Sequence, residues 1–332
     1  MTFLAATAAT ARELLDSAAL EAWNEEVVVG LGLILGACQM DERAGNTAPA
    51  PPQGQKAVPA VEQQLKQEMG RVATSKDGTR IAFEKAGSGP AVIVISGALS
   101  HRGLYRDQTF PARLSEHFTV YLYDRRGRGE STDAQPYAVE REIEDIGALL
   151  DDAGGSGYLY GVSSGGALAL QAAAKLGPAK VTKLAIYDAP YGQKPEDFAG
   201  QKQRVGELVR TAEPGEAASF FLSAIGTPPE ALEGMKRSPD WDAIKKIDFT
   251  LTYDYAVLGD GDVPEEIVKA IRVPLLVMNG EKSMAFMGSA ADRIAALVPQ
   301  SQRKTLEGQA HQAEAEVVVP VLVEFFTGSS TR

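Results

Sequence analysis

From about residue 70 onward, apolar runs of strand length alternate with longer amphipathic segments. The clearest run is 91–97, AVIVISG, which is rich in β-branched residues, as expected of a strand buried on both faces. Further strands are predicted at five segments: 118–124, 157–162, 181–188, 273–280 and 302–308. Two shorter runs, 71–75 and 79–87, flank Lys76-Asp77-Gly78, a sequence that favours a hairpin.

The segments between these strands have the spacing of helices. In 137–150, apolar residues recur on one helix face at four positions: Val139, Ile143, Ile146 and Leu150. Further helices are predicted at 165–176, 289–298 and 314–326. Strands that alternate with helices indicate an α/β fold, in which a mostly parallel, twisted sheet is flanked by helices on both faces.

Residues 190–270 interrupt this alternation. They contain no convincing strand, several short helical pieces and a group of aromatic residues that includes Phe198, Trp241 and Tyr255. An insertion between two sheet strands is expected to cover the strand ends as a helical lid, and further helical core is the alternative. The pattern divides the chain into an extension (1–60), a core (70–189 and 271–332) and a helical cap (190–270).

The N-terminal extension contains the apolar run 27–38, VVVGLGLILGAC. A bilayer span needs roughly 20 apolar residues, whereas the apolar core of a signal peptide needs about 7–15. The run ends in Leu35-Gly36-Ala37-Cys38, which resembles the lipobox of bacterial lipoproteins and implies lipidation of Cys38 and a membrane tether. An Ala/Pro-rich stretch, 44–60, follows as a flexible linker.

The charge before this run indicates the opposite. A signal peptide begins with basic residues, but the segment 21–26, EAWNEE, is acidic. Two localisations therefore stay open. The protein is exported and membrane-anchored through Cys38, or it is cytoplasmic with a helical or disordered extension.

Composition excludes several classes of partner. The net charge of the 332-residue chain is −11, which argues against nucleic-acid binding. Its single cysteine excludes an internal disulfide and a cysteine-based zinc site. His101, His117 and His311 lack the spacing of metal ligands, and no G-x-G-x-x-G motif follows the first strand of the core. We therefore expect no metal and no organic cofactor, and the sequence carries no signal for an oligomeric state.

The stretch Gly161-Val162-Ser163-Ser164-Gly165 joins a predicted strand to a predicted helix and fits the pattern G-x-S-x-G. So tight a turn strains its central residue and requires small neighbours two positions away. The Ser163 hydroxyl is then exposed at the carboxyl end of a strand, above a helix N-terminus that favours negative charge. A plain glycine-rich turn is the alternative to this nucleophile elbow.

With this motif the chain resembles the α/β-hydrolase superfamily over roughly residues 70–330. The segment 123–131, YDRRGRGES, is similar to the D-x-R-G-x-G-x-S stretch of these enzymes. The segment 306–316, LEGQAHQAEAE, places His311 in the last strand–helix loop, where the family keeps its catalytic histidine. The resemblance implies the α/β-hydrolase fold and a small bacterial, esterase-like serine hydrolase.

The proton acceptor and its partner follow from the chemistry of serine. Because a serine hydroxyl is a poor nucleophile without a base, His311, which follows the serine in the order Ser…acid…His, is the predicted base. The family usually has Asp or Glu where this chain has Ser283. Asp188, at the end of the strand after the elbow helix, is the favoured substitute, although it also suits a turn cap. Glu281 is the alternative acid, and a histidine without an ionic partner is the third option.

The remaining predicted roles belong to the loop after the third strand. The backbone N–H groups of Ser164 and Ala98 are the candidate oxyanion donors, although the family often has His-Gly where this chain has Ser96-Gly97. Three residues of this loop are expected to contact substrate: Gly97, Leu99 and His101.

Two hypotheses about function follow. In the first, the enzyme cleaves a small-molecule carboxylic ester or thioester through an acyl-enzyme intermediate on Ser163, and the cap aromatics favour an apolar substrate group. Relatives that act as dehalogenases or epoxide hydrolases have aspartate at the elbow, so the serine argues against those reactions. In the second, the absence of Asp or Glu at the usual acid position indicates a binding protein or a lyase with the same fold.

Overall fold

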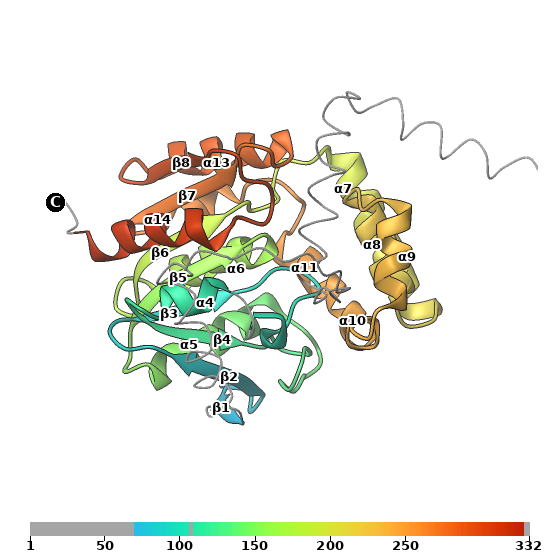
Figure 1. Cartoon of the computed structure of the whole chain (residues 1–332), viewed down its shortest axis with the longest axis horizontal. Coiled ribbons are helices and arrows are strands. Elements are labelled where there is room, and N and C mark those ends of the chain that lie inside the picture. The colour runs from blue at the N-terminus through green and yellow to red at the C-terminus, as the bar shows by residue number, and fades with distance from the viewer. Residues whose placement is uncertain (1–69, 106–108, 329–332) are drawn as a thin grey trace, which may run out of the picture.

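A computed structural model of the chain describes residues 70–105 and 109–328. At its centre lies an eight-stranded sheet with the order β1-β2-β4-β3-β5-β6-β7-β8 (Figure 1). The strands are β1 (Arg71–Thr74), β2 (Arg80–Ala86), β3 (Ala91–Ile95), β4 (Thr119–Tyr123), β5 (Gly157–Val162), β6 (Val181–Tyr187), β7 (Leu275–Gly280) and β8 (Gln302–Leu306). β2 pairs antiparallel with β1 and β4, and the other pairs are parallel.

The predicted α/β class is therefore confirmed, and each predicted strand forms. Every residue of β3 and of β7 is buried, which explains their unbroken apolar sequences. The hairpin between β1 and β2 also forms, with the Asp77 carboxylate accepting a hydrogen bond from the Thr79 N–H at 2.9 Å.

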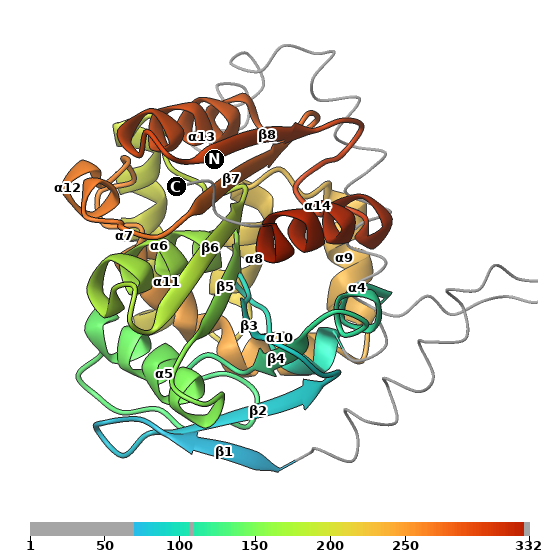
Figure 2. The same cartoon turned by 90° about the vertical axis from the view of Figure 1, so that its left-hand side faces the viewer.

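Helices cover both faces of the sheet (Figure 2). One face carries α5 (Val139–Asp152), α6 (Ser164–Leu176) and α13 (Ala285–Leu297), whose apolar residues form one core with that face. The other face carries α4 (Thr109–Leu114) and α14 (Ala315–Thr327). The short α4, like the 3₁₀ turn η2 (Arg102–Tyr105), has no counterpart among the predicted elements.

Between β6 and β7 the chain forms helices and, over 190–270, no strand. These helices are α7 (Pro195–Thr211), α8 (Glu216–Ala224), α9 (Pro229–Arg237), α10 (Trp241–Ile247), α11 (Leu251–Val257) and α12 (Glu265–Lys269), with the 3₁₀ turn η3 (Asp248–Thr250) before α11. Several aromatic residues of this insertion are buried and pack together, as Phe198 does against Tyr255 at 5.4 Å between ring centroids. They are core residues of the insertion, and a lid function for it stays a prediction.

The predicted lipidation at Cys38, the signal segment and the linker all lie outside the described residues. Among the residues that are described, no helix combines the length and the apolar character that crossing a bilayer requires.

Phe326 on α14 anchors the core under one face of the sheet. Its ring stacks on Tyr158 at 4.7 Å between centroids and meets Phe118 edge-on at 5.8 Å, and the residue is 1% exposed. We expect Phe326→Ala to lower the free energy of unfolding by about 3–5 kcal/mol, because it opens a cavity between α14 and the sheet. Urea denaturation measures the change, and Glu324→Ala on the exposed side of α14 should stay within about 0.5 kcal/mol of wild type.

Candidate active site

Ser163 occupies the whole turn between β5 and α6. The strand ends at Val162 and the helix begins at Ser164, so the serine alone reverses the chain direction. It has φ 56° and ψ −131°, a conformation that side-chain-bearing residues rarely adopt. The turn therefore has the strained geometry that the G-x-S-x-G pattern predicts.

The two flanking glycines permit this turn because neither position has room for a side chain. A Cβ on Gly161 would lie 2.4 Å from the carbonyl oxygen of Gly165. A Cβ on Gly165 would lie 2.2 Å from the carbonyl oxygen of Ile95 in β3. The elbow is thus packed directly against the neighbouring strand.

Three residues with strained backbone conformations lie at the same edge of the sheet. Among residues 70–105 and 109–328, the non-glycine residues with positive φ are Leu99 at 53°, Ser163 at 56° and Asp188 at 50°. They follow the carboxyl ends of β3, β5 and β6, and each of them has a predicted role in the site. Because strained residues concentrate where a fold holds reactive groups in place, this edge is the candidate active site.

The structure brings His311 and Asp188 together. The His311 Nδ1 atom lies 3.1 Å from the Asp188 Oδ2 atom, although the two residues are 123 positions apart in sequence. Asp188 is 1% exposed, whereas the His311 side chain is one-third exposed. If Nδ1–H donates to the carboxylate, Nε2 has the free lone pair that a general base needs.

The serine at the family's usual acid position contacts the same aspartate. The Ser283 hydroxyl donates a hydrogen bond to Asp188 Oδ2, and the Gly280 N–H donates to Asp188 Oδ1 at 3.2 Å. Glu281, the alternative acid, is exposed, and its carboxylate accepts the Gly308 N–H at 2.8 Å. The geometry therefore favours Asp188 over Glu281 as the partner of His311.

The loop that carries His311 is held by a hydrogen bond from Tyr187, the last residue of β6. The Tyr187 hydroxyl donates to the carbonyl oxygen of Ala310, the residue before the histidine. Burial raises the pKa of Tyr187 far above its usual range, so the hydroxyl keeps its proton for this bond. Gly280 leaves room for the contact, because a Cβ there would lie 2.5 Å from the Tyr187 hydroxyl oxygen.

The loop after β3 lies against the serine. A Cβ on Gly97 would be 2.9 Å from Ser163 Cβ and 3.4 Å from Ser163 Oγ. Ala98, the candidate oxyanion donor, follows directly. Ser164, the other candidate, is the first residue of α6, and the first N–H groups of a helix have no acceptor within it.

Leu99 and His101, which are predicted to contact substrate, have contacts within the protein itself. Leu99 is buried and belongs to the core beneath α5 and α6. The His101 ring folds over Gly103, where a Cβ would lie 2.9 Å from its Nδ1 atom. Substrate-binding roles for Gly97, Leu99 and His101 stay predictions.

The segment 123–131 closes on itself through its aspartate. The Asp124 carboxylate accepts the N–H groups of Arg102 at 2.7 Å and of Glu130 at 2.8 Å. It lies so close to Gly129 that a Cβ there would be 2.2 Å from Asp124 Oδ2. Ser131 donates to the Asp124 carbonyl at 2.6 Å, so the motif shapes a loop rather than supplying reacting groups.

Two arginines of this segment bind a carboxylate that is not among the predicted site residues. Arg125 and Arg128 are buried, and both donate to Asp254 of α11, at 2.7 Å and 2.8 Å. Asp254 stands within an apolar and aromatic stretch, 251–258, LTYDYAVL. A lone carboxylate in such a stretch needs a buried cationic partner, and that was the available signal.

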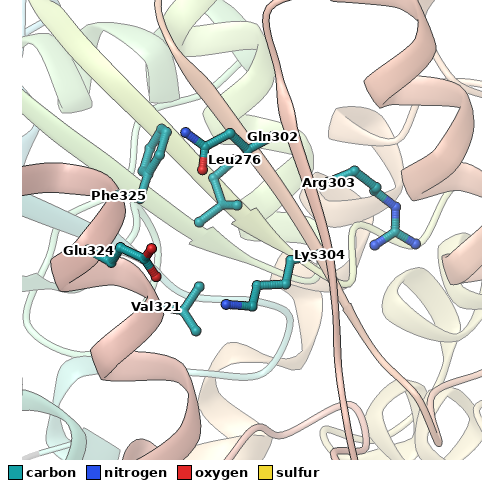
Figure 3. A pocket seen from close by; sticks show the side chains of 7 residues that line it. All are labelled: Leu276, Gln302, Arg303, Lys304, Val321, Glu324 and Phe325. Carbon is teal, nitrogen blue, oxygen red and sulfur yellow. The ribbon is translucent and has the colours of Figure 1, made fainter. Parts of the chain in front are cut away.

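A hollow of about 100 Å³ lies between β7, β8 and α14, where Leu276 and Gln302 begin the strand pairing (Figure 3). It is at the amino ends of parallel strands, opposite the edge that carries Ser163. In the part of the chain that the structure describes, no three His, Cys, Asp or Glu side chains gather as a metal site would require.

The mostly parallel sheet, with strained residues at the carboxyl ends of its central strands, is the architecture of the α/β-hydrolase fold. A model of the alpha/beta hydrolase family matches residues 92–321, and the chain belongs to this family. The resemblance drawn from the motifs is thereby confirmed.

Solved structures agree with this assignment. An alpha/beta hydrolase from Sphaerobacter thermophilus superposes with a TM-score of 0.68 at 40% identity, covering 77% of this chain and 100% of that one. A thermophilic esterase from Thermogutta terrifontis shares the fold, with a TM-score of 0.61 at 22% identity, covering 79% of this chain and 99% of that one.

A curated relative is much longer than this chain. The polyketide synthase ThaQ of Burkholderia thailandensis is 25% identical over 269 residues, which are 75% of this chain and 12% of that protein. The chain thus spans only 12% of the length of this relative.

The packing of the elbow generates a stability prediction. We expect Gly165→Ala to lower the free energy of unfolding by about 3 kcal/mol or more, because its Cβ meets the rigid backbone of β3. Gly206→Ala is the matched control: it lies within α7 with nothing within 4 Å of the added Cβ, and we expect a gain of up to about 1 kcal/mol. Chemical denaturation compares the two, and equal stabilities would contradict the packing described for the elbow.

Proposed function

We propose that this α/β hydrolase cleaves carboxylic esters or thioesters of small molecules through an acyl-enzyme intermediate on Ser163. The observation that supports this most is the 3.1 Å contact between His311 Nδ1 and the buried Asp188 carboxylate, at the sheet edge where the strained Ser163 turn is also found. A positioned imidazole is what a serine hydroxyl needs to become a nucleophile.

In the acylation half-reaction, Ser163 Oγ attacks the carbonyl carbon and its proton passes to His311 Nε2. The Asp188 carboxylate holds the resulting imidazolium through Nδ1–H. The negative charge that develops on the carbonyl oxygen is stabilised by the N–H groups of Ala98 and Ser164. The tetrahedral intermediate then collapses, and His311 returns the proton to the leaving alcohol or thiol.

In the deacylation half-reaction, water takes the place of the alcohol. His311 accepts a proton from the water as it attacks the acyl carbon, and the same two N–H groups hold the second oxyanion. Collapse of this intermediate transfers the proton from His311 to Ser163 Oγ and releases the carboxylic acid. Over the whole cycle one water is consumed, every proton taken by His311 is returned, and no atom changes its oxidation state.

The helical insertion, residues 190–270, forms the cap over this site in the proposal. What supports the assignment is the hydrogen bond of 2.8 Å from the Ser164 hydroxyl to Asp254 of α11, beside the elbow. Side chains of the cap then limit which substrates reach Ser163.

A fluorophosphonate probe tests the nucleophile. We expect covalent labelling of Ser163, located by mass spectrometry, and hydrolysis of p-nitrophenyl acetate, because both reactions need a serine deprotonated by a histidine. Ser163→Ala should abolish labelling and lower the hydrolysis rate by at least about 10³-fold. A folded wild type that is neither labelled nor active would instead favour a binding protein or a lyase.

The identity of the acid is tested by a pair of variants. Asp188→Asn should lower kcat by about 10²–10⁴-fold, because an amide no longer stabilises the imidazolium. Glu281→Gln should leave kcat within about threefold, because the Glu281 carboxylate contacts the Gly308 N–H. Steady-state kinetics on p-nitrophenyl acetate measures both, and the reverse order of effects would assign the acid to Glu281.

A further inference from the structure

A buried cluster of four charged side chains lies beneath the elbow. Arg125 binds Glu142 through two contacts of 2.7 Å and Asp254 through one of 2.7 Å. Arg128 binds both oxygens of Asp254, at 2.9 Å and 2.8 Å. The four side chains are at most 5% exposed, and their two positive and two negative charges balance.

Asp254 is the centre of this cluster, and it comes from α11 of the insertion. Burial alone would raise the pKa of Asp254, but the charges of Arg128 and Arg125 and the Ser164 hydrogen bond hold it below its usual value. The carboxylate is therefore ionised at neutral pH and is a strong hydrogen-bond acceptor.

One branch of the cluster reaches the elbow directly. The Ser164 hydroxyl donates to Asp254 Oδ1 at 2.8 Å, and Ser164 is buried. Because this bond fixes the Ser164 side chain, it also restrains the backbone whose N–H is a proposed oxyanion donor.

The other branch reaches the loop after β3. Arg128 Nη1 donates to the carbonyl oxygen of Gly97 at 2.6 Å, and Arg125 Nη1 donates to that of Ser96 at 3.4 Å. The Gly97 carbonyl and the Ala98 N–H belong to one planar trans peptide and point in opposite directions. The Arg128 contact therefore turns the Ala98 N–H away from the arginine and restrains the other proposed donor.

We propose that Asp254 is a positioning residue that holds both oxyanion donors in place, through the Ser164 hydroxyl on one side and through Arg128 and the Gly97 carbonyl on the other. Asp254 acts through these groups and does not touch the substrate. The role rests on the proposed function, and it makes docking of α11 a condition for a complete oxyanion hole.

The main test is Asp254→Asn, with Asp145→Asn as the matched control. Asp145 is also a buried carboxylate in a two-point contact with an arginine of the same segment, Arg126, at 2.6 Å and 2.8 Å. Asp145 and Arg126 form no hydrogen bond with Ser164 or Gly97 in the described residues. A purely structural role would make the two variants alike.

We expect Asp254→Asn to lower kcat on p-nitrophenyl acetate by about 10²-fold, the usual effect of losing an oxyanion donor, with KM changed less than about threefold. A trifluoromethyl ketone, which forms a tetrahedral oxyanion with serine, should lose affinity by the same factor. Asp145→Asn should leave kcat and ketone affinity within about threefold of wild type.

A second variant keeps the test decisive if Asp254→Asn does not fold. Ser164→Ala removes one hydrogen bond to Asp254, retains the backbone N–H and alters no charge, and we expect kcat and ketone affinity to fall together by about 3- to 10-fold. Unchanged kcat and ketone affinity in Ser164→Ala, or in folded Asp254→Asn, would overturn the inference.

The wild-type protein separates the two proposals. If it is labelled at Ser163 and hydrolyses p-nitrophenyl acetate, the proposed function stands, and unaffected variants remove only the role of Asp254. If the wild type shows neither reaction, the proposed function fails first.

Discussion

The turn at Ser163 is the constraint on which the rest of the site depends. Ser163 lies between a strand and a helix with φ 56°, a strained conformation that persists only when the packing around it excludes other conformations. Gly165 packs against the β3 backbone and Gly97 packs against the serine itself, so the loop after β3 has to follow the elbow closely. The geometry of the turn therefore also determines where the candidate oxyanion donors lie.

In the proposed triad the acid follows β6, whereas the resemblance to the family places it after β7. β6 and β7 are adjacent parallel strands, so side chains that follow them share one edge of the sheet. Asp188 reaches His311 from the end of β6, and Ser283, after β7, donates a hydrogen bond to its carboxylate. Ser283, at the family's usual acid position, is thus a hydrogen-bond donor to Asp188, and the proposed acid stands at the end of the neighbouring strand β6.

The sequence predicted the sheet and most of its helices because their apolar periodicity is strong and local. It missed α4, whose six residues are too few for a periodic pattern. It favoured Asp188 as the acid but left open Glu281 and a histidine without an ionic partner, since that choice depends on where two loops meet in space. Asp254 was missed for the same reason, because its partner Arg128 lies 126 residues away in sequence.

The buried charges also explain why a helical insertion can be more than a cover. A charged cluster under the elbow costs desolvation, which its contacts recover only when every partner is present. Asp254 supplies the carboxylate that both Arg125 and Arg128 share, so both arginines have this ionic partner only when α11 is docked. Tyr253 beside it stacks on Tyr137 of the core at 3.8 Å between centroids, which holds α11 from a second side. The element that borders the site is thus fixed to the core by the same cluster that contacts the Ser164 hydroxyl and the Gly97 carbonyl.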